Sequence, residues 1–144
     1  MPTKIHLRID PKLCSGCLSC MTTCSFVNED YVSLSAARLK VELNLFSATN
    51  KIDLCRQCGK APCVNACQVN AIMLSPHAST QAWVIDYEIC TGCQDCIPAC
   101  PFHAIFWDSI TGRVIKCELC GGEPQCVLAC PTNALVLVEF QEKE

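Results

Sequence analysis

Sixteen of the 144 residues are cysteines, and they fall into four groups of four along the chain. The groups are Cys14, Cys17, Cys20 and Cys24; Cys55, Cys58, Cys63 and Cys67; Cys90, Cys93, Cys96 and Cys100; and Cys117, Cys120, Cys126 and Cys130. Each group contains a C-x2-C pair and ends in C-x3-C, so no cysteine is left over. Thiolate sulfur is a ligand of iron–sulfur clusters and of structural zinc. The pattern therefore predicts that all the cysteines bind metal.

The spacing favours cubane clusters. The first and third groups follow C-x2-C-x2-C-x3-C, and Pro101 comes directly after the third, as in bacterial iron–sulfur proteins. Three cysteines in a short loop can bind three irons of one [4Fe–4S] cluster, while the fourth points away toward a second cluster. Gly16, Gly59 and Gly92 lie in such loops, where they either bring backbone N–H groups near cluster sulfur or serve as ordinary turns. The four groups thus predict four [4Fe–4S] clusters.

Zinc sites and disulfides are the alternatives for so many cysteines. Zinc modules hold two C-x2-C pairs separated by a longer stretch, whereas each group here is contiguous. The first eight residues carry no signal-peptide pattern, and no apolar run approaches the ~20 residues of a membrane span. We therefore expect a cytoplasmic chain without a membrane span, where metal binding is commoner than disulfide formation.

Charge and motifs argue against several other functions. The net charge is −3, and the 11 Lys and Arg residues are scattered, which argues against a nucleic-acid-binding surface. No nucleophile–base pair, phosphate-binding loop or dinucleotide motif stands out. Trp83 and Trp107 are expected to pack in the core or to shield a cluster. We therefore expect a chain that carries metal and has no catalytic site of its own.

An internal duplication indicates how the cysteine groups are positioned. Residues 9–17 match residues 85–93, and residues 62–67 match residues 124–130 apart from one insertion. The repeat unit is therefore about half of the chain. The first and third groups are one type of cysteine loop, and the second and fourth are another.

Alternating apolar and polar residues predict short strands. The expected strands are residues 5–9, 39–45, 82–86 and 135–140, with a hairpin over residues 105–116 that turns at 110–112. Short helices are expected after each C-x3-C, ending near Asn70, His103 and Asn133. Because His103 takes the place of the two asparagines in the repeat, we expect it to have a structural role and not to bind metal. The elements predict an α+β fold.

The stretch from Cys55 to Pro101 resembles a bacterial two-cluster ferredoxin, with a quartet, C-x-x-N-A-I, a hairpin, V-I-D-x-x-x-C and a second quartet. The whole chain resembles the four-cluster iron–sulfur subunits of dimethyl sulfoxide reductase, formate dehydrogenase and hydrogenases, and above all the compact form that serves tungsten aldehyde oxidoreductases. Ser25 and Gln68 depart from the family pattern, in which Pro often follows the fourth cysteine.

This resemblance implies a duplicated bacterial ferredoxin-like fold built around four [4Fe–4S] clusters. Residues 1–144 would form one compact unit of two intertwined modules. The inner module would comprise about residues 50–105, and the outer module about residues 1–49 plus 106–144.

The resemblance also implies which cysteines share a cluster. One cluster would take Cys14, Cys17 and Cys20 with Cys130; the second Cys117, Cys120 and Cys126 with Cys24; the third Cys55, Cys58 and Cys63 with Cys100; and the fourth Cys90, Cys93 and Cys96 with Cys67. The hairpin expected between Cys67 and Cys90 supports the inner pairing. A tandem pairing, of the first group with the second and of the third with the fourth, stays open.

Together these features predict a non-catalytic subunit that passes single electrons through its clusters. The resemblance implies a large catalytic oxidoreductase subunit with a tungsten or molybdenum pterin as partner. An aldehyde oxidoreductase is favoured, and a formate dehydrogenase or hydrogenase comes next. The external partner would be an FAD- or NAD-binding subunit or a ferredoxin, and end-to-end self-association is conceivable. A free soluble polyferredoxin is the alternative.

Three cations beside cysteines are candidates for raising the reduction potential of a cluster. They are Arg56, Lys60 and Lys116. Their alternative role is that of solvated surface charges. The sequence leaves the choice between the two roles open.

Overall fold

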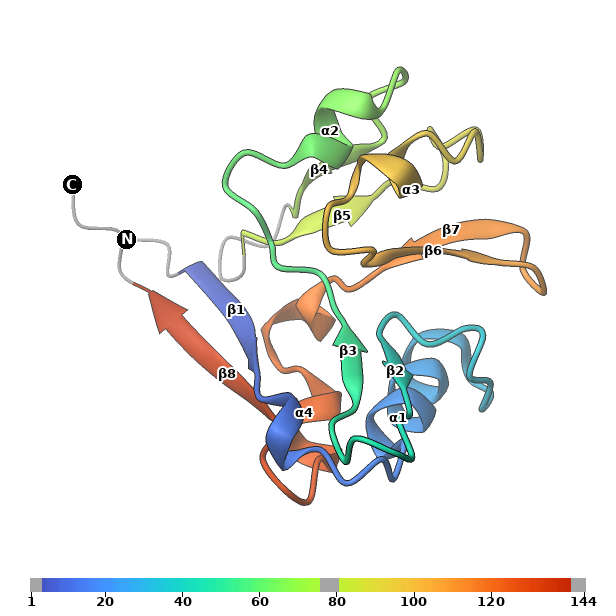
Figure 1. Cartoon of the computed structure of the whole chain (residues 1–144). Helices are drawn as coiled ribbons and strands as arrows, with labels where there is room; N and C mark the ends of the chain where they lie inside the picture. The colour runs from blue at the N-terminus through green and yellow to red at the C-terminus, as the bar shows by residue number, and fades with distance from the viewer. Residues whose placement is uncertain (1–3, 76–80, 141–144) are drawn as a thin grey trace.

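Short antiparallel strand pairs and short helices alternate along the chain (Figure 1). The computed structural model describes residues 4–75 and 81–140. The strand pairs are β1 (Lys4–Ile9) with β8 (Leu135–Phe140), β2 (Lys40–Glu42) with β3 (Lys51–Asp53), β4 (Ile72–Leu74) with β5 (Trp83–Ile85), and β6 (Ile105–Asp108) with β7 (Arg113–Lys116). The helices are α1 (Ser19–Glu29), α2 (Pro62–Ala66), α3 (Cys96–Ala99) and α4 (Gln125–Ala129), with short 3-10 helices η1 (Pro11–Leu13) and η2 (Leu119–Gly122). The predicted α+β class is confirmed.

The first and last strands of the chain pair with each other. β1 runs antiparallel to β8, with Leu7 opposite Leu137 (Figure 1). Ile5 and Leu7 are buried because alternate residues of a strand face the same side. Strands were expected at both places, and both are confirmed. Their pairing brings the first cysteine group close to the last.

Two hairpins lie in the middle of the chain. The predicted hairpin over residues 105–116 is present as β6 and β7, and it turns where Gly112 has a φ of +66° and donates its N–H to the Asp108 carbonyl. A positive φ of this kind suits glycine because it has no Cβ. β4 and β5 form the other hairpin, and β5 confirms the strand expected near residues 82–86.

The strand predicted over residues 39–45 is shorter than expected. β2 ends at Glu42, and the chain then enters a loop in which Leu45 is exposed. The side chain of Asn50 organises this loop: its Oδ1 accepts the N–H of Asn44 at 3.2 Å and its Nδ2 donates to the Cys14 carbonyl at 3.2 Å. These side-chain bonds take the place of a strand ladder, which alternation of residue types alone does not reveal.

Helices were expected after the C-x3-C segments, but each helix instead includes the third cysteine of its group, and α1 alone of the four continues past the fourth. α2, α3 and α4 each end directly before the fourth cysteine of their group, which is the C-cap residue. Asn70, His103 and Asn133 therefore are not at helix ends. Each lies three residues beyond the cap with a φ between +52° and +57°, so they share one left-handed turn position. The structural role expected for His103 is this turn.

The buried apolar residues form two cores. One gathers residues of β1, α1, β3 and β8, and includes Leu7 and Leu39. The other gathers residues of α2, β4, β5, β6 and β7, and includes Ile72 and Ile105. The elements of the two cores occupy the lower and upper halves of Figure 1 respectively. Each core also contains cysteines, so the metal ligands are part of the packing.

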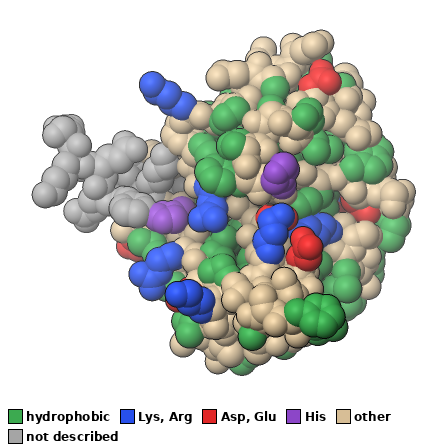
Figure 2. Space-filling view, viewed as in Figure 1, with side chains coloured by type: hydrophobic (Ala, Val, Ile, Leu, Met, Phe, Trp, Pro, Cys, Tyr) green, Lys and Arg blue, Asp and Glu red, His purple; other side chains and the backbone are tan. Residues whose placement is uncertain are grey.

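The cores are small, and many large apolar side chains stay at the surface. Leu45, Phe46 and Leu128 are at least three-quarters exposed. Figure 2 shows hydrophobic side chains spread over the visible face and mixed with charged ones. Among the described residues, no helix has the length and apolar character needed to cross a membrane. With so little buried apolar surface, ligand binding to the cysteines must contribute to folding stability.

Replacing Leu7 by Ala tests the role of the pairing between β1 and β8. Leu7 is 1% exposed, so we expect Leu7→Ala to lower the free energy of unfolding by about 2–5 kcal/mol through lost burial and the cavity left behind. Anaerobic guanidinium unfolding followed by circular dichroism measures the change. Leu45→Ala is the matched control, because this side chain is 88% exposed and should shift stability by no more than about 0.5 kcal/mol. Equal effects of the two substitutions would contradict the expectation.

Candidate metal centres

All sixteen cysteines lie in the described part of the chain, and all are free thiols. The cysteines differ in how far they are exposed to solvent. Cys17 and Cys93 are exposed, while the buried cysteines are Cys24, Cys63, Cys96, Cys117 and Cys126. The disulfide alternative is therefore not found among these cysteines.

Three cavities are each lined by four cysteines. Site 1 is lined by Cys14, Cys17, Cys20 and Cys130; site 2 by Cys24, Cys117, Cys120 and Cys126; and site 4 by Cys67, Cys90, Cys93 and Cys96. The three volumes agree, at about 330–340 Å³ including the part open to solvent. The same kind of group therefore fits all three. Each cavity combines three cysteines of one group with the fourth cysteine of another.

The remaining cysteines are Cys55, Cys58, Cys63 and Cys100, which we call site 3. The charges of Cys55 and Cys100 act on the Cys63 thiol, so these three lie close together. Helix packing explains the exchange of the fourth cysteines. α1 packs against α4, and α2 packs against α3. Because each of these helices contains the third cysteine of its group and carries the fourth within it or directly after it, packing two helices together brings each fourth cysteine to the other group.

Burial keeps most of the deep thiols neutral when no metal is bound. It raises the pKa of Cys117 to about 12 and the pKa of Cys20 and Cys96 to about 11. Burial also raises the pKa of Cys126, and the neighbouring thiolates of sites 1 and 2 raise it further. The exposed Cys17 differs, because hydrogen bonds from Ser19 lower its pKa. Thiolates in the interior therefore require a cation to hold them, and metal binding there displaces protons.

Backbone N–H groups point at the sulfur of the fourth cysteines. The N–H of Ala71 lies 3.2 Å from Cys67 Sγ, and the N–H of Ala104 lies 3.4 Å from Cys100 Sγ. In both cases the preceding residue has the positive φ that turns the amide back toward the cysteine. Burial raises the pKa of Cys130, but amides that include those of Leu135 and Ala134 outweigh it and lower the pKa. Such donors stabilise negative charge on sulfur.

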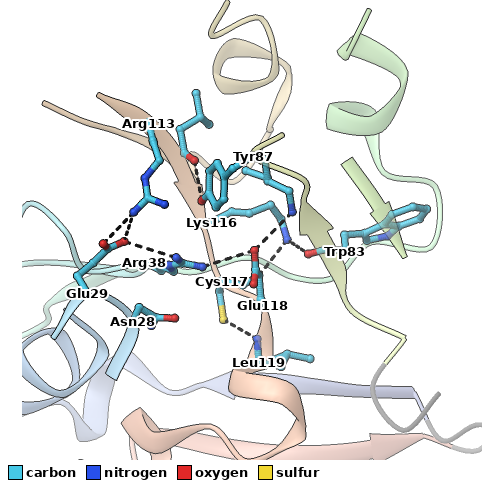
Figure 3. A network of polar contacts seen from close by, with 12 residues as sticks. Asn28, Glu29, Arg38, Trp83, Tyr87, Arg113, Lys116, Cys117, Glu118 and Leu119 are labelled. Carbon is cyan, nitrogen blue, oxygen red and sulfur yellow. Dashed lines mark hydrogen bonds and ion pairs between the residues drawn. The ribbon is translucent and has the colours of Figure 1, made fainter. Parts of the chain in front are cut away.

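At Cys24 the donor comes from a distant segment. The N–H of Arg38 lies 3.2 Å from Cys24 Sγ, and Asn28 Nδ2 lies 3.5 Å from the same sulfur. Arg38 lines site 2, and its guanidinium forms ion pairs with Glu29 and Glu118 at 3.6 and 3.5 Å (Figure 3). Nothing in the sequence pattern singles out Arg38, because it lies 14 residues from Cys24 in a segment that contains no cysteine.

The three cations that the sequence singled out fall into two classes. Arg56 and Lys60 are exposed, and the Arg56 guanidinium lies over the Phe102 ring at 5.3 Å. Lys116 is fully buried. Both tryptophans contact cysteine loops: the Trp83 indole donates to the Cys58 carbonyl at 2.8 Å, and the Trp107 ring lies beside Gly92. The tryptophans therefore pack against the loops, as expected.

The donor sets fit polynuclear clusters better than single ions. In residues 4–75 and 81–140, no three His, Cys, Asp or Glu side chains are placed to hold one metal ion. A tetrahedral zinc site would need four thiolates about 2.3 Å from one point. The cysteines instead surround cavities, and at site 2 the buried Nε of Arg38 has no hydrogen-bond partner among the described residues. Four thiolates around a cavity, with N–H groups and a cation facing it, suit an anionic [4Fe–4S] cluster.

Comparison with known proteins agrees with this chemistry. The family model described as "4Fe-4S dicluster domain" matches residues 47–140, and that described as "4Fe-4S binding domain" matches residues 11–27. Over 98 residues the chain is 42% identical to the "Aliphatic sulfonate oxidoreductase, polyferredoxin-like subunit" of Pyrococcus furiosus, which covers 68% of this chain and 55% of that protein. Over 110 residues it is 35% identical to a tetrathionate reductase subunit of Archaeoglobus fulgidus, covering 75% and 51%. The chain thus spans about half the length of these curated relatives.

A solved structure shares the fold. The "Active site complex BamBC of Benzoyl Coenzyme A reductase as isolated" contains a chain that matches with a TM-score of 0.60 at 20% identity, covering 99% of this chain and 81% of that one. The second, third and fourth cysteine groups and the hairpins β4–β5 and β6–β7 fall within the larger family match. The cofactors are therefore [4Fe–4S] clusters, and the chain belongs to the family of 4Fe-4S dicluster domain proteins with a ferredoxin-like fold.

Proposed function

We propose that the chain is an electron-transfer subunit that relays single electrons through four [4Fe–4S] clusters held at sites 1 to 4. The observation that carries the proposal is the set of cavities lined by four cysteines each, at sites 1, 2 and 4. The proximity of Cys63 to Cys55 and Cys100 supports the same arrangement at site 3. The short helices contain or adjoin the cysteine groups, and the short strands connect them. This arrangement supports a role of the described chain as an electron relay.

The proposed order of the sites is a row, and it is supported by which thiols act on one another through their charges. Site 1 adjoins site 2, because the charge of Cys20 acts on Cys126. Site 2 adjoins site 3 through Cys55 and Cys117, and site 3 adjoins site 4 through Cys63 and Cys96. Electron tunnelling falls exponentially with distance, so a row of adjacent one-electron centres carries current faster than one long step. Sites 1 and 4 form the ends of the proposed relay, and each includes an exposed cysteine.

We propose that the two ends belong to two modules. The outer module, about residues 1–49 plus 106–144, would supply the cysteines of sites 1 and 2, and the inner module, about residues 50–105, those of sites 3 and 4. The hairpin of β6 and β7 spans this boundary and packs with the inner core. The pairing of β1 with β8 and the packing of α1 on α4 support the outer module. The pairing of β4 with β5 and the packing of α2 on α3 support the inner one.

The proposed partner is the large catalytic subunit of an oxidoreductase. The names of relatives support this choice, since one belongs to an aliphatic sulfonate oxidoreductase and another to a tetrathionate reductase. We propose a tungsten- or molybdenum-pterin enzyme at one end, with an aldehyde oxidoreductase as the favoured type and a formate dehydrogenase or hydrogenase next. An FAD- or NAD-binding subunit or a ferredoxin would accept or supply electrons at the other end.

Anaerobic purification from the native host tests the function. We expect a large subunit to co-purify in fixed stoichiometry through a high-salt wash, and the chain to contain about sixteen iron and sixteen sulfide for four cubanes. Iron and sulfide analysis with quantitative SDS–PAGE provides the measurement. A chain that carries its iron but elutes alone would instead be a free polyferredoxin. A chain with zinc and no sulfide would rule out both roles.

Serine substitutions test which cysteines share a cluster. If the fourth cysteines are exchanged as in the cavities, Cys130→Ser and Cys14→Ser should alter the same EPR signal, because both remove a ligand of site 1. Cys67→Ser should alter a different signal, that of site 4. Under tandem pairing, Cys14→Ser and Cys67→Ser would affect one common cluster instead. EPR of the dithionite-reduced variants distinguishes the two patterns.

Exposure predicts the order in which clusters are lost to an oxidant. Sites 1 and 4 should lose iron first, because Cys17 and Cys93 are exposed, and site 2 last, because three of its cysteines are buried. Hydrogen bonds from Ser19 lower the pKa of Cys17, which increases the thiolate fraction of its freed thiol and so its reactivity. Brief air exposure, alkylation with iodoacetamide and peptide mass spectrometry reveal the order. Early labelling of Cys117 would contradict the expectation.

A further inference from the structure

Lys116 is a fully buried lysine whose charge no carboxylate neutralises among the described residues. Its relative exposure is 0%, and its Nζ donates to two main-chain carbonyls, those of Trp83 and Cys117 (Figure 3). Lysine is almost never fully buried unless it is paired, because removing an ammonium ion from water costs several kcal/mol. The two carbonyls accept hydrogen bonds from the ammonium group, but they carry no net charge that could neutralise it. A buried anion is therefore expected near it.

A closed ring of hydrogen bonds holds the ammonium group in place. Lys116 Nζ donates to the Trp83 carbonyl, the Trp83 N–H donates to Gln57 Oε1 at 2.9 Å, and Gln57 Nε2 donates to the Cys117 carbonyl at 2.9 Å. The Cys117 carbonyl also accepts Lys116 Nζ at 2.9 Å, which completes the ring. Gln57 is 2% exposed, so the ring is shielded from solvent. The ammonium group consequently has little freedom to turn toward water.

The ring joins the cysteine loops of two different sites. Gln57 lies between Cys55 and Cys58 of site 3, while Cys117 is a residue of site 2. The charge of Lys116 reaches both sites: it lowers the pKa of Cys63 and of Cys117, which burial raises. Lys116 therefore lies at the point where the outer and inner cysteine groups meet.

We propose that Lys116 is a shared buried cation that stabilises the added electron on the clusters at sites 2 and 3 and so makes the middle of the relay easier to reduce. The inference rests on the proposed function, because it requires clusters at both sites. A reduced [4Fe–4S] cluster carries one more negative charge than the oxidised cluster, and a fixed cation nearby favours the reduced form. The effect should be large for sites 2 and 3, and small for sites 1 and 4.

The second buried cation at the junction differs from Lys116. Arg38 also lies beside site 2, but its guanidinium pairs with Glu29 and Glu118. Each carboxylate oxygen of Glu29 in turn accepts a hydrogen bond from Arg113 Nη2 at 2.8 Å. The charge of Arg38 acts on Cys24 of site 2, but these two arginines and two glutamates have no net formal charge, so neighbouring carboxylates offset part of its effect. Lys116 is therefore the cation whose charge remains available to the clusters.

Potentiometric titration of Lys116→Met, monitored by EPR on the cluster-loaded chain, tests the proposal. We expect two of the four midpoint potentials to fall, so that at a fixed potential the ratio of reduced to oxidised cluster drops about tenfold at each, equivalent to 59 mV for one electron. The other two midpoints should stay in place. Lys116→Arg keeps the charge and should restore both potentials. Lys60→Met is the matched control, since it removes an exposed lysine of the site 3 loop and should shift neither midpoint.

Several outcomes would overturn the proposal. They are unchanged midpoints in a fully loaded Lys116→Met, an equal shift in Lys60→Met, or failure of Lys116→Arg to restore the potentials. If Lys116→Met does not assemble its clusters, Lys116→Gln takes its place in the titration. Glutamine keeps a hydrogen-bond donor for the ring but lacks the charge. Assembly in Lys116→Arg but in neither neutral variant would support a requirement for charge, whereas failure of all three would show that side-chain shape matters instead. A wild-type chain without four clusters would refute the proposed function itself.

Discussion

The constraint on which this structure depends is the burial of negative charge by a chain with very little apolar core. An oxidised [4Fe–4S] cluster with four thiolates carries roughly −2, and such a charge is costly to bury without donors and cations. Hydrogen-bond donors close to the cysteines offset part of this cost. Amides such as those of Ala71 and Ala104 point at sulfur, and the left-handed turn before each of them is what aims the N–H. The short helices and strands then hold these turns in place.

Packing of paired helices turns four separate cysteine groups into an interlocked unit. Because α1 packs on α4 and α2 on α3, the fourth cysteine of one group lies beside the cysteines of another at sites 1, 2 and 4. Under the proposed ligation, each of these helix pairs would be joined twice by metal. The pairing of β1 with β8 closes the outer part of the chain in the same way. Cluster binding and folding are therefore coupled, which is how a chain with so many exposed apolar side chains can hold one structure.

In the proposed relay, the end sites and the middle sites differ in their exposure to solvent. The end sites each have an exposed cysteine, which allows an electron to enter or leave through a docked partner. The middle is shielded, and there the ring of Lys116, Gln57, Trp83 and Cys117 ties the two modules together. In the proposed arrangement, one hydrogen-bond network would both join the modules and place a cation between their clusters. Exposed cations such as Lys60 are screened by water and cannot have the same effect.

Cysteine spacing by itself determined the cofactor type, and apolar alternation determined β1, β5, β8 and the hairpin of β6 and β7, because both are local properties of consecutive residues. The positions of the helices were predicted wrongly, since α2, α3 and α4 end directly before the fourth cysteine and do not begin after it. The contact of Arg38 with Cys24 and the burial of Lys116 were beyond the reach of the sequence. Lys60 and Lys116 both lie close to cysteines in sequence, yet only the folded chain withdraws one of them from water, because burial depends on what distant segments bring to cover it.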